Sequence, residues 1–214
     1  MAAELKIDFV SDVSCPWCAI GLASLEQAIE RLGDEVSVQI HFQPFELNPQ
    51  MPAEGRDTVQ YLVEKYGRTP EQVRHSSEAI RARGKEVGFV FGARERVYNT
   101  FDAHRLLHWA GLEGRQRALK HALLAAYFTD GKDVSAHDVL VELASQVGLD
   151  AQQAREVLSS GTYTAEVRER EQFYQKLGID SVPAIIINEA HLLQGGQPVE
   201  VFEQALRQIA GTGE

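Results

Sequence analysis

The chain has 214 residues, a formal net charge of −10 and only two cysteines. A chain of this length can bury a substantial core without disulfide staples, as one domain, as two, or as one domain inserted into another. The acidic balance argues against a general surface for nucleic acid or anionic membranes. No stretch approaches the roughly 20 apolar residues that are needed to cross a bilayer.

The chain opens with a predicted strand that is followed by a helix. Residues 5–10 alternate apolar and polar side chains, as a half-buried strand does. Apolar residues then recur at helical spacing and stop before Gly33, at Cys18, Leu22, Leu25, Ile29 and Leu32. Because no secretory signal precedes the first strand, we expect a cytoplasmic protein.

Both cysteines lie where this strand meets this helix, in the run Cys15-Pro16-Trp17-Cys18. With no other cysteine to pair with, this pair indicates a redox unit rather than a structural staple. Pro16 fits the first helical position because it has no N–H to leave unpaired. Cys15 would then lie at or just before the first turn, where unpaired N–H groups and the positive end of the helix dipole stabilise a thiolate.

A second strand follows the first helix, and after it the pattern becomes helical. A second strand is predicted over residues 36–42, and the strand–helix–strand order favours a parallel pair. From about residue 57 to residue 161 the pattern is helical, and Thr69-Pro70-Glu71-Gln72 and Asp150 predict capped helix starts.

After residue 164 the chain returns to alternating helices and strands. A helix is predicted over residues 165–177, a short apolar strand over 182–188, a strand over 191–193 and a last helix from near Pro198. Helices and strands at both ends therefore flank a central block of helices.

This arrangement resembles the DsbA-like branch of the thioredoxin fold. It is most similar to the FrnE-type oxidoreductases, which are related to 2-hydroxychromene-2-carboxylate isomerase and kappa-class glutathione transferase. The segments that carry the resemblance are Ser11–Gly21, Ala103–Leu106, Ala126–Phe128, Gly148–Asp150, Ser181–Pro183 and Gly195–Pro198.

The resemblance implies an α/β fold. A thioredoxin-like domain of residues 1–56 and 165–214 would be interrupted by an all-helical domain of residues 57–164 that overhangs the redox site. It also implies a cis peptide bond at Pro183, beside the cysteine pair, with the backbone of Val182 offered to an extended substrate.

The expected chemistry is thiol–disulfide exchange. An exposed Cys15 attacks a substrate disulfide, and a more buried Cys18 resolves the mixed disulfide. The dithiol is then the redox centre itself, with no bound metal or flavin, because a zinc site would need two further ligands. The substrate could be a protein disulfide or a small thiol or disulfide, with glutathione as a co-substrate. The direction of electron flow stays open, as does a homodimer.

Two side chains near the cysteines have alternative interpretations. Trp17 could offer an apolar platform for substrate or simply pack against the fold. Asp12 could relay protons to the resolving thiol or cap a turn near the helix start, and the cap is favoured.

Four residues of the central block are weaker candidates. His104 and His108 are four apart, as two metal ligands on a helix would be, but a hydrogen-bonded interface histidine is favoured for His104. The resemblance places His104 in the cleft between the domains. Asn99 and Arg105 could orient the carboxylate of a peptide or of glutathione.

Two other functions remain as alternatives. A glutathione-dependent isomerase or transferase shares this fold, but it needs no pair of protein cysteines. A non-catalytic binding or chaperone module would use the same cleft without either thiol.

Overall fold

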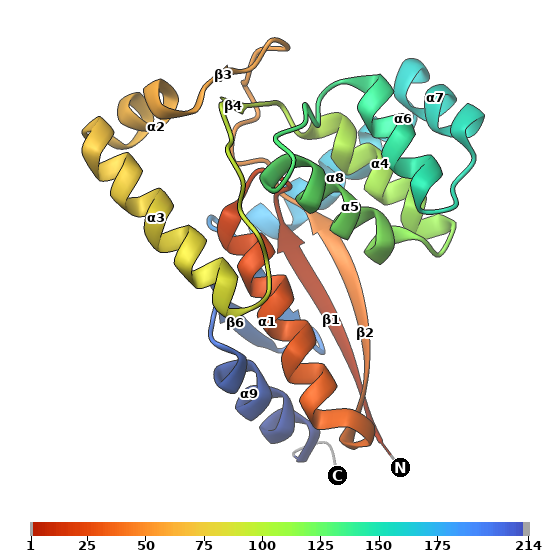
Figure 1. Cartoon of the computed structure of the whole chain (residues 1–214). Helices are drawn as coiled ribbons and strands as arrows, with labels where there is room; N and C mark the ends of the chain where they lie inside the picture. Colours follow the sequence, from red (N-terminus) through yellow and green to blue (C-terminus); the bar gives the residue numbers. More distant parts are fainter. Residues whose placement is uncertain (1, 212–214) are drawn as a thin grey trace.

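The structure is a computed structural model that describes residues 2–211 (Figure 1). The first elements are β1 (Ala3–Ser11), α1 (Pro16–Leu32) and β2 (Val36–Pro44). The middle of the chain forms β3 (Arg56–Asp57), α2 (Thr58–Tyr66), α3 (Pro70–Glu86), β4 (Arg96–Val97), α4 (Phe101–Leu112), α5 (Gln116–Phe128), α6 (His137–Gln146) and α7 (Ala151–Ser160). The last elements are α8 (Thr164–Lys176), β5 (Ala184–Ile187), β6 (His191–Gln194) and α9 (Val199–Gly211).

The main sheet is built from the two ends of the chain, in the order β2-β1-β5-β6. Strands β1 and β2 are parallel, with Ile7 opposite Ile40, which confirms the predicted crossover. Strand β5 runs antiparallel to β1, with Phe9 opposite Ile185, and β6 runs antiparallel to β5. The residues on either side of the central block therefore form one sheet.

Helices cover both faces of this sheet. Ile7 and Phe9 belong to the same buried cluster as residues of α1 and α9, whereas Val10 packs in a separate cluster with Tyr174 of α8. The predicted strand is present, but the prediction that it is half-buried is wrong, because residues 7–11 are all buried. Asp8 tolerates this position because its carboxylate accepts a hydrogen bond from Gln43 at 2.7 Å.

The central segment is helical except where the chain leaves the sheet and comes back. There β3 and β4 pair antiparallel over two residues each, so the segment is not all-helical. Arg96 fixes this pair by donating to the carbonyl oxygens of Glu54 and Gly55 at 2.8 and 3.0 Å. A side chain at Gly55 would meet the Val97 carbonyl at 2.6 Å, so the close approach needs glycine. A ladder this short leaves no periodicity in the sequence.

One buried apolar cluster runs through both parts of the molecule. It joins Phe9 and Leu25 of the sheet and α1 to Leu106, Leu123 and Leu140 of the central helices. The domain boundaries at residues 56/57 and 164/165 stay a prediction. Within the described residues, no helix is long and apolar enough to span a membrane.

A single side chain covers part of the outer edge of β2. The backbone N–H of Phe42 donates to Oε1 of Gln116 at 2.9 Å, and Nε2 of Gln116 donates to the Phe42 carbonyl at 3.1 Å. This amide on α5 therefore makes the two bonds that a neighbouring strand would make. The sheet is in this way tied to the central helices.

The predicted capping box at Thr69 is present, and its loss should destabilise the protein. The Thr69 hydroxyl accepts from the N–H of Gln72 at 3.2 Å, and the Gln72 side chain accepts from the N–H of Thr69 at 2.9 Å. We expect Thr69→Ala to lower the free energy of unfolding by about 1 kcal/mol. Urea denaturation measures this loss, and an unchanged midpoint would show that the first turn of α3 does not depend on the cap.

Candidate active site

The two cysteines lie at the start of α1, on the end of the sheet that the central segment overhangs. Cys15 is the residue before the helix, with extended φ and ψ of −92° and 114°, and Pro16 takes the first helical position as predicted. The Cys15 carbonyl accepts from the N–H of Cys18 at 3.1 Å and so closes the first turn. Both cysteines are free thiols.

The exposure of the two thiols differs from the prediction in one respect. Cys18 is completely buried, as expected, but Cys15 is only 4% exposed. The predicted exposed Cys15 is therefore wrong, because the segment before Pro183 lies over its sulfur. The Cys15 thiol donates to the carbonyl of Val182 across 3.6 Å, and the Val182–Pro183 peptide bond is cis, as the resemblance implies.

The electrostatics of the site keep Cys18 protonated in the resting molecule. Burial raises the pKa of the Cys18 thiol well above its ordinary value, and the hydrogen bond and charge of Cys15 act in the same direction. The charge of Lys120 opposes them. Cys18 consequently stays neutral until another step favours its thiolate.

Asp12 organises the loop that carries Cys15. Its carboxylate accepts from the N–H and the hydroxyl of Ser14 at 3.2 and 2.9 Å and from the N–H of Leu47 at 2.7 Å. Burial alone would raise the pKa of Asp12, but His104, the N–H of Leu47 and the side chain of Thr100 outweigh burial and lower the pKa to about 2. Asp12 is thus a permanent carboxylate that fixes the loop, which agrees with the favoured turn-capping role.

Cys15 lines a cavity of about 610 Å³ under α2 and α3. Pro16, Trp17 and Val182 line it with Cys15, and Trp17 is 42% exposed. Pro183 is also buried, and its ring lies 3.1 Å from where a Cβ atom at Gly21 would stand. The structure therefore brings Cys15, Pro16, Trp17, Val182 and Pro183 together.

The two predicted site residues of the central segment do not line this cavity. Asn99 instead accepts from the N–H of Phe101 at 2.9 Å, at the start of α4. His104 is buried, with Nε2 3.1 Å from the Phe45 carbonyl and 3.5 Å from Asp12, so it is the hydrogen-bonded interface histidine that was favoured. The guanidinium of Arg105 donates to the Asp102 carboxylate and to the carbonyl of Thr162 at 2.6 and 2.9 Å. These bonds leave it no free pair of N–H groups for the carboxylate of a substrate.

Most of the cavity wall was not predicted from the sequence. Helices α2 and α3 supply a mainly apolar and aromatic surface, and basic side chains stand at its rim. The unpredicted lining includes Phe45, Glu46, Tyr61, Leu62, Tyr66, Arg68, Val73, Ile80 and Arg94. The one available signal was the amphipathic spacing of Tyr61, Leu62 and Tyr66, which is also typical of packing against a core.

Glu46 is a charged member of that wall. Burial raises its pKa, while the ion pair with Arg168 opposes this change. Arg168 also pairs with Glu171 at 2.7 Å and lies 3.7 Å above the ring of Phe101. This network ties the loop after β2 to α8 and α4 beside the cavity.

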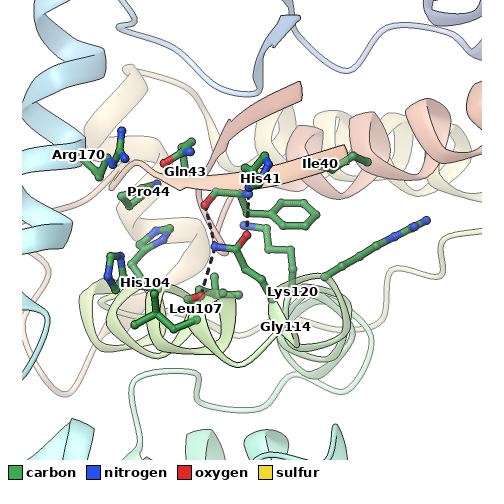
Figure 2. A pocket seen from close by; sticks show the side chains of 15 residues that line it. Ile40, His41, Gln43, Pro44, His104, Leu107, Gly114, Lys120 and Arg170 are labelled. Carbon is green, nitrogen blue, oxygen red and sulfur yellow. Dashed lines mark hydrogen bonds between the residues drawn. The ribbon is translucent and has the colours of Figure 1, made fainter. Parts of the chain in front are cut away.

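A second cavity, of about 450 Å³, lies along β2 on the side of α4 and α5 (Figure 2). His41, His104, Lys120 and Arg170 line it, and Figure 2 shows Lys120 reaching toward β2. The lining residues of the two cavities, all within the described part of the chain, do not overlap. Over residues 2–211 the structure has no group of three or more His, Cys, Asp or Glu side chains arranged to hold a metal ion.

The sheet order, the helix that starts at a Cys-x-x-Cys turn and the cis-proline beside it define a thioredoxin-like domain with a helical insertion. Residues 6–207 match the DSBA-like thioredoxin domain family, and the chain belongs to this family of thiol oxidoreductases.

Solved structures agree with this membership. A probable DsbA oxidoreductase from Streptomyces coelicolor is 35% identical, with a TM-score of 0.92 over 98% of this chain and 91% of that one. A 2-hydroxychromene-2-carboxylate isomerase is 15% identical, with a TM-score of 0.73 over 98% of this chain and 100% of that one.

The cytosolic disulfide reductase DsbM of Pseudomonas aeruginosa, solved with glutathione, is 18% identical to this chain. Its TM-score is 0.66 over 95% of this chain and 98% of that one. At these identities the isomerase and the reductase share the fold with this chain, and the fold alone does not separate their activities.

Proposed function

We propose that this protein is a thiol:disulfide oxidoreductase of the FrnE type that works through the Cys15–Cys18 dithiol. The observation that carries the proposal is the unequal placement of the two thiols. Cys15 lines a cavity of about 610 Å³ at a helix start, while Cys18 is fully buried one turn behind it. One thiol is thus placed to meet a substrate and the other to meet only its neighbour.

The exchange proceeds in two balanced steps. The Cys15 thiolate attacks one sulfur of a substrate disulfide, forms a mixed disulfide and releases the first substrate thiol. Cys18 then attacks the Cys15 sulfur, closes the Cys15–Cys18 disulfide and releases the second thiol. The substrate gains two electrons and the dithiol loses two, and each departing thiolate takes up a proton. Run backwards, the same steps oxidise a substrate dithiol.

The cavity favours a substrate with an extended, partly apolar surface beside its sulfur. Trp17, Tyr61 and Tyr66 offer aromatic faces, and the backbone of Val182 borders Cys15. Either a protein disulfide or a small disulfide such as that of glutathione fits this description. No bound cofactor is needed, because the dithiol itself carries the electrons. We place the protein in the cytoplasm, where the disulfide reductase DsbM of Pseudomonas aeruginosa, which shares the fold, is described.

A redox titration tests the proposal. The purified protein is equilibrated in glutathione buffers of graded ratio, free thiols are alkylated, and the labels on Cys15 and Cys18 are counted by mass. We expect both labels to appear and disappear together at one midpoint. If the pair never closes and only a glutathione adduct at Cys15 forms, the dithiol mechanism is wrong and the glutathione-dependent isomerase takes its place.

A further inference from the structure

Lys120 is a buried cation that the fold alone does not explain. Its side chain extends from α5 toward β2 and is completely buried (Figure 2). Within residues 2–211 its ammonium has no hydrogen-bond partner, and the ring of Phe42 lies 5.9 Å away. Lysine is almost never fully buried without a partner, because an unpaired buried charge is strongly disfavoured. Burial accordingly lowers the pKa of Lys120.

The charges that favour the ammonium all belong to the redox site. Cys18, Asp12 and Cys15 each raise the pKa of Lys120 against the effect of burial, and Cys18 has the largest influence of the three. His104, on the neighbouring helix α4, lines the same cavity as Lys120. Of Cys18, Asp12 and Cys15, only the two thiols take part in the bond changes of disulfide exchange.

The Asp12 carboxylate is not suited to take the proton of Cys18, although a hydrogen bond with the Asp12 backbone lowers the pKa of the Cys18 thiol. The two carboxylate oxygens are held by Ser14 and Leu47, and a carboxylate with a pKa of about 2 is a weak base. A negative charge nearby also disfavours a second one on Cys18. A buried thiol that must ionise is instead favoured by a cation, and the charge of Lys120 lowers the pKa of the Cys18 thiol.

We propose that Lys120 is the charge partner of the resolving thiol Cys18. When the mixed disulfide forms on Cys15, the Lys120 ammonium stabilises the Cys18 thiolate, which attacks the Cys15 sulfur. The substrate thiolate then leaves and takes up the proton that Cys18 has lost, while Lys120 keeps its own. This role rests on the proposed function. In it, the central helical segment supplies a positioning residue for the disulfide exchange at the start of α1.

Two-phase release of thionitrobenzoate tests this role. Reduced protein is mixed with dithiobis-nitrobenzoate in stopped flow at pH 7, where attack by Cys15 releases one thionitrobenzoate and resolution by Cys18 releases a second. Lys120→Met keeps the length and the apolar stem of the side chain and removes the charge. We expect the second phase to slow by about tenfold or more, which is the effect of raising the thiol pKa by one unit. The first phase should change much less.

The pH profile separates this role from a structural one. In Lys120→Met the second phase should recover as the pH rises, because hydroxide then ionises Cys18 without the cation. Lys176→Met, at an exposed lysine on α8 that lines neither cavity, is the matched control and should leave the second phase unchanged. Thermal melting should show that Lys120→Met is folded and at least as stable as the parent, since a buried unpaired charge has been removed.

Two failures can be told apart in these experiments. Equal second phases in the parent and in Lys120→Met, at every pH, would overturn the role of Lys120 and leave the exchange mechanism standing. Absence of a second phase in the parent protein would instead overturn the proposed function.

Discussion

Replacing Cys15 with serine is expected to abolish disulfide exchange, whereas Cys18→Ser is expected to stop the reaction at the mixed disulfide. Cys15 is the thiol that lines the cavity, and Cys18 is fully enclosed behind it. Without the nucleophile, turnover should fall by at least about three orders of magnitude, because the remaining thiol, Cys18, is fully buried and does not line the cavity. Intact mass after exposure to oxidised glutathione should show no adduct on Cys15→Ser and one stable adduct on Cys18→Ser.

The two variants act as controls for each other because each removes one sulfur from the same turn. Both should keep the fold, since serine is nearly the same size as cysteine. An adduct on the remaining Cys18 of the Cys15→Ser variant would reverse the assigned roles. Full activity in Cys15→Ser would point to the glutathione-dependent isomerase or to a binding module.

Asp12→Asn is expected to be among the most destabilising single substitutions near the site. The Asp12 carboxylate is completely buried and accepts three hydrogen bonds from Ser14 and Leu47. An amide presents an N–H₂ group to donors that need an acceptor, and it removes the charge that faces His104. We expect a loss of about 3 kcal/mol in the free energy of unfolding at pH 7, measured by urea denaturation.

The loss should shrink in acid, because Asp12 itself contributes to the pH dependence of stability. Its pKa is about 2 in the folded protein and ordinarily 3.8, so folding favours the charged form. This contribution, about 2 kcal/mol, is complete above the ordinary pKa and disappears as the pH falls toward 2. The parent and Asp12→Asn should therefore converge in stability between pH 4 and pH 2.

Asp180→Asn provides the matched control for this comparison. Asp180 lines the Cys15 cavity but is exposed, so its substitution should change stability by less than about 0.5 kcal/mol. If Asp12→Asn were as mild as Asp180→Asn, the buried carboxylate would not be what holds the Cys15 loop.

The parts of the fold that local chemistry determines were predictable from the sequence. Pro16 at the first position of α1, the Thr69 capping box and the Asp150 cap are all present in the structure. The resemblance supplied what periodicity could not, namely the cis bond at Pro183 and the helical segment over the site. The burial of β1 on both faces was missed because alternating side chains indicate only one buried face. The pattern within β1 gives no sign that α8, more than 150 residues later in the chain, covers the other face.

Within the site, the reactive residues could be predicted from the sequence, whereas the residues of the cavity wall could not. Cys15, Pro16, Trp17 and Cys18 are contiguous, so their placement needs only one turn of helix. The walls come from residues 30 to 82 positions after Cys15 and from residues 180–182, more than 160 positions after it. In the sequence most of these side chains look like ordinary packing or surface residues. Lys120, which lines the second cavity, was missed for a similar reason, because a lysine in an amphipathic helix is normally expected to face water.

The continuous apolar cluster that joins the sheet to the central helices limits how this protein can be cut or recombined. Excising residues 57–164 would strip Phe9 and Leu25 of part of their cover, and the isolated helices would show the matching surface to water. The two parts should accordingly melt in one cooperative transition and resist transplantation as separate modules. Removing a methyl group from a buried leucine of α5, such as Leu123, is therefore expected to lower the stability of the sheet and of the central helices together.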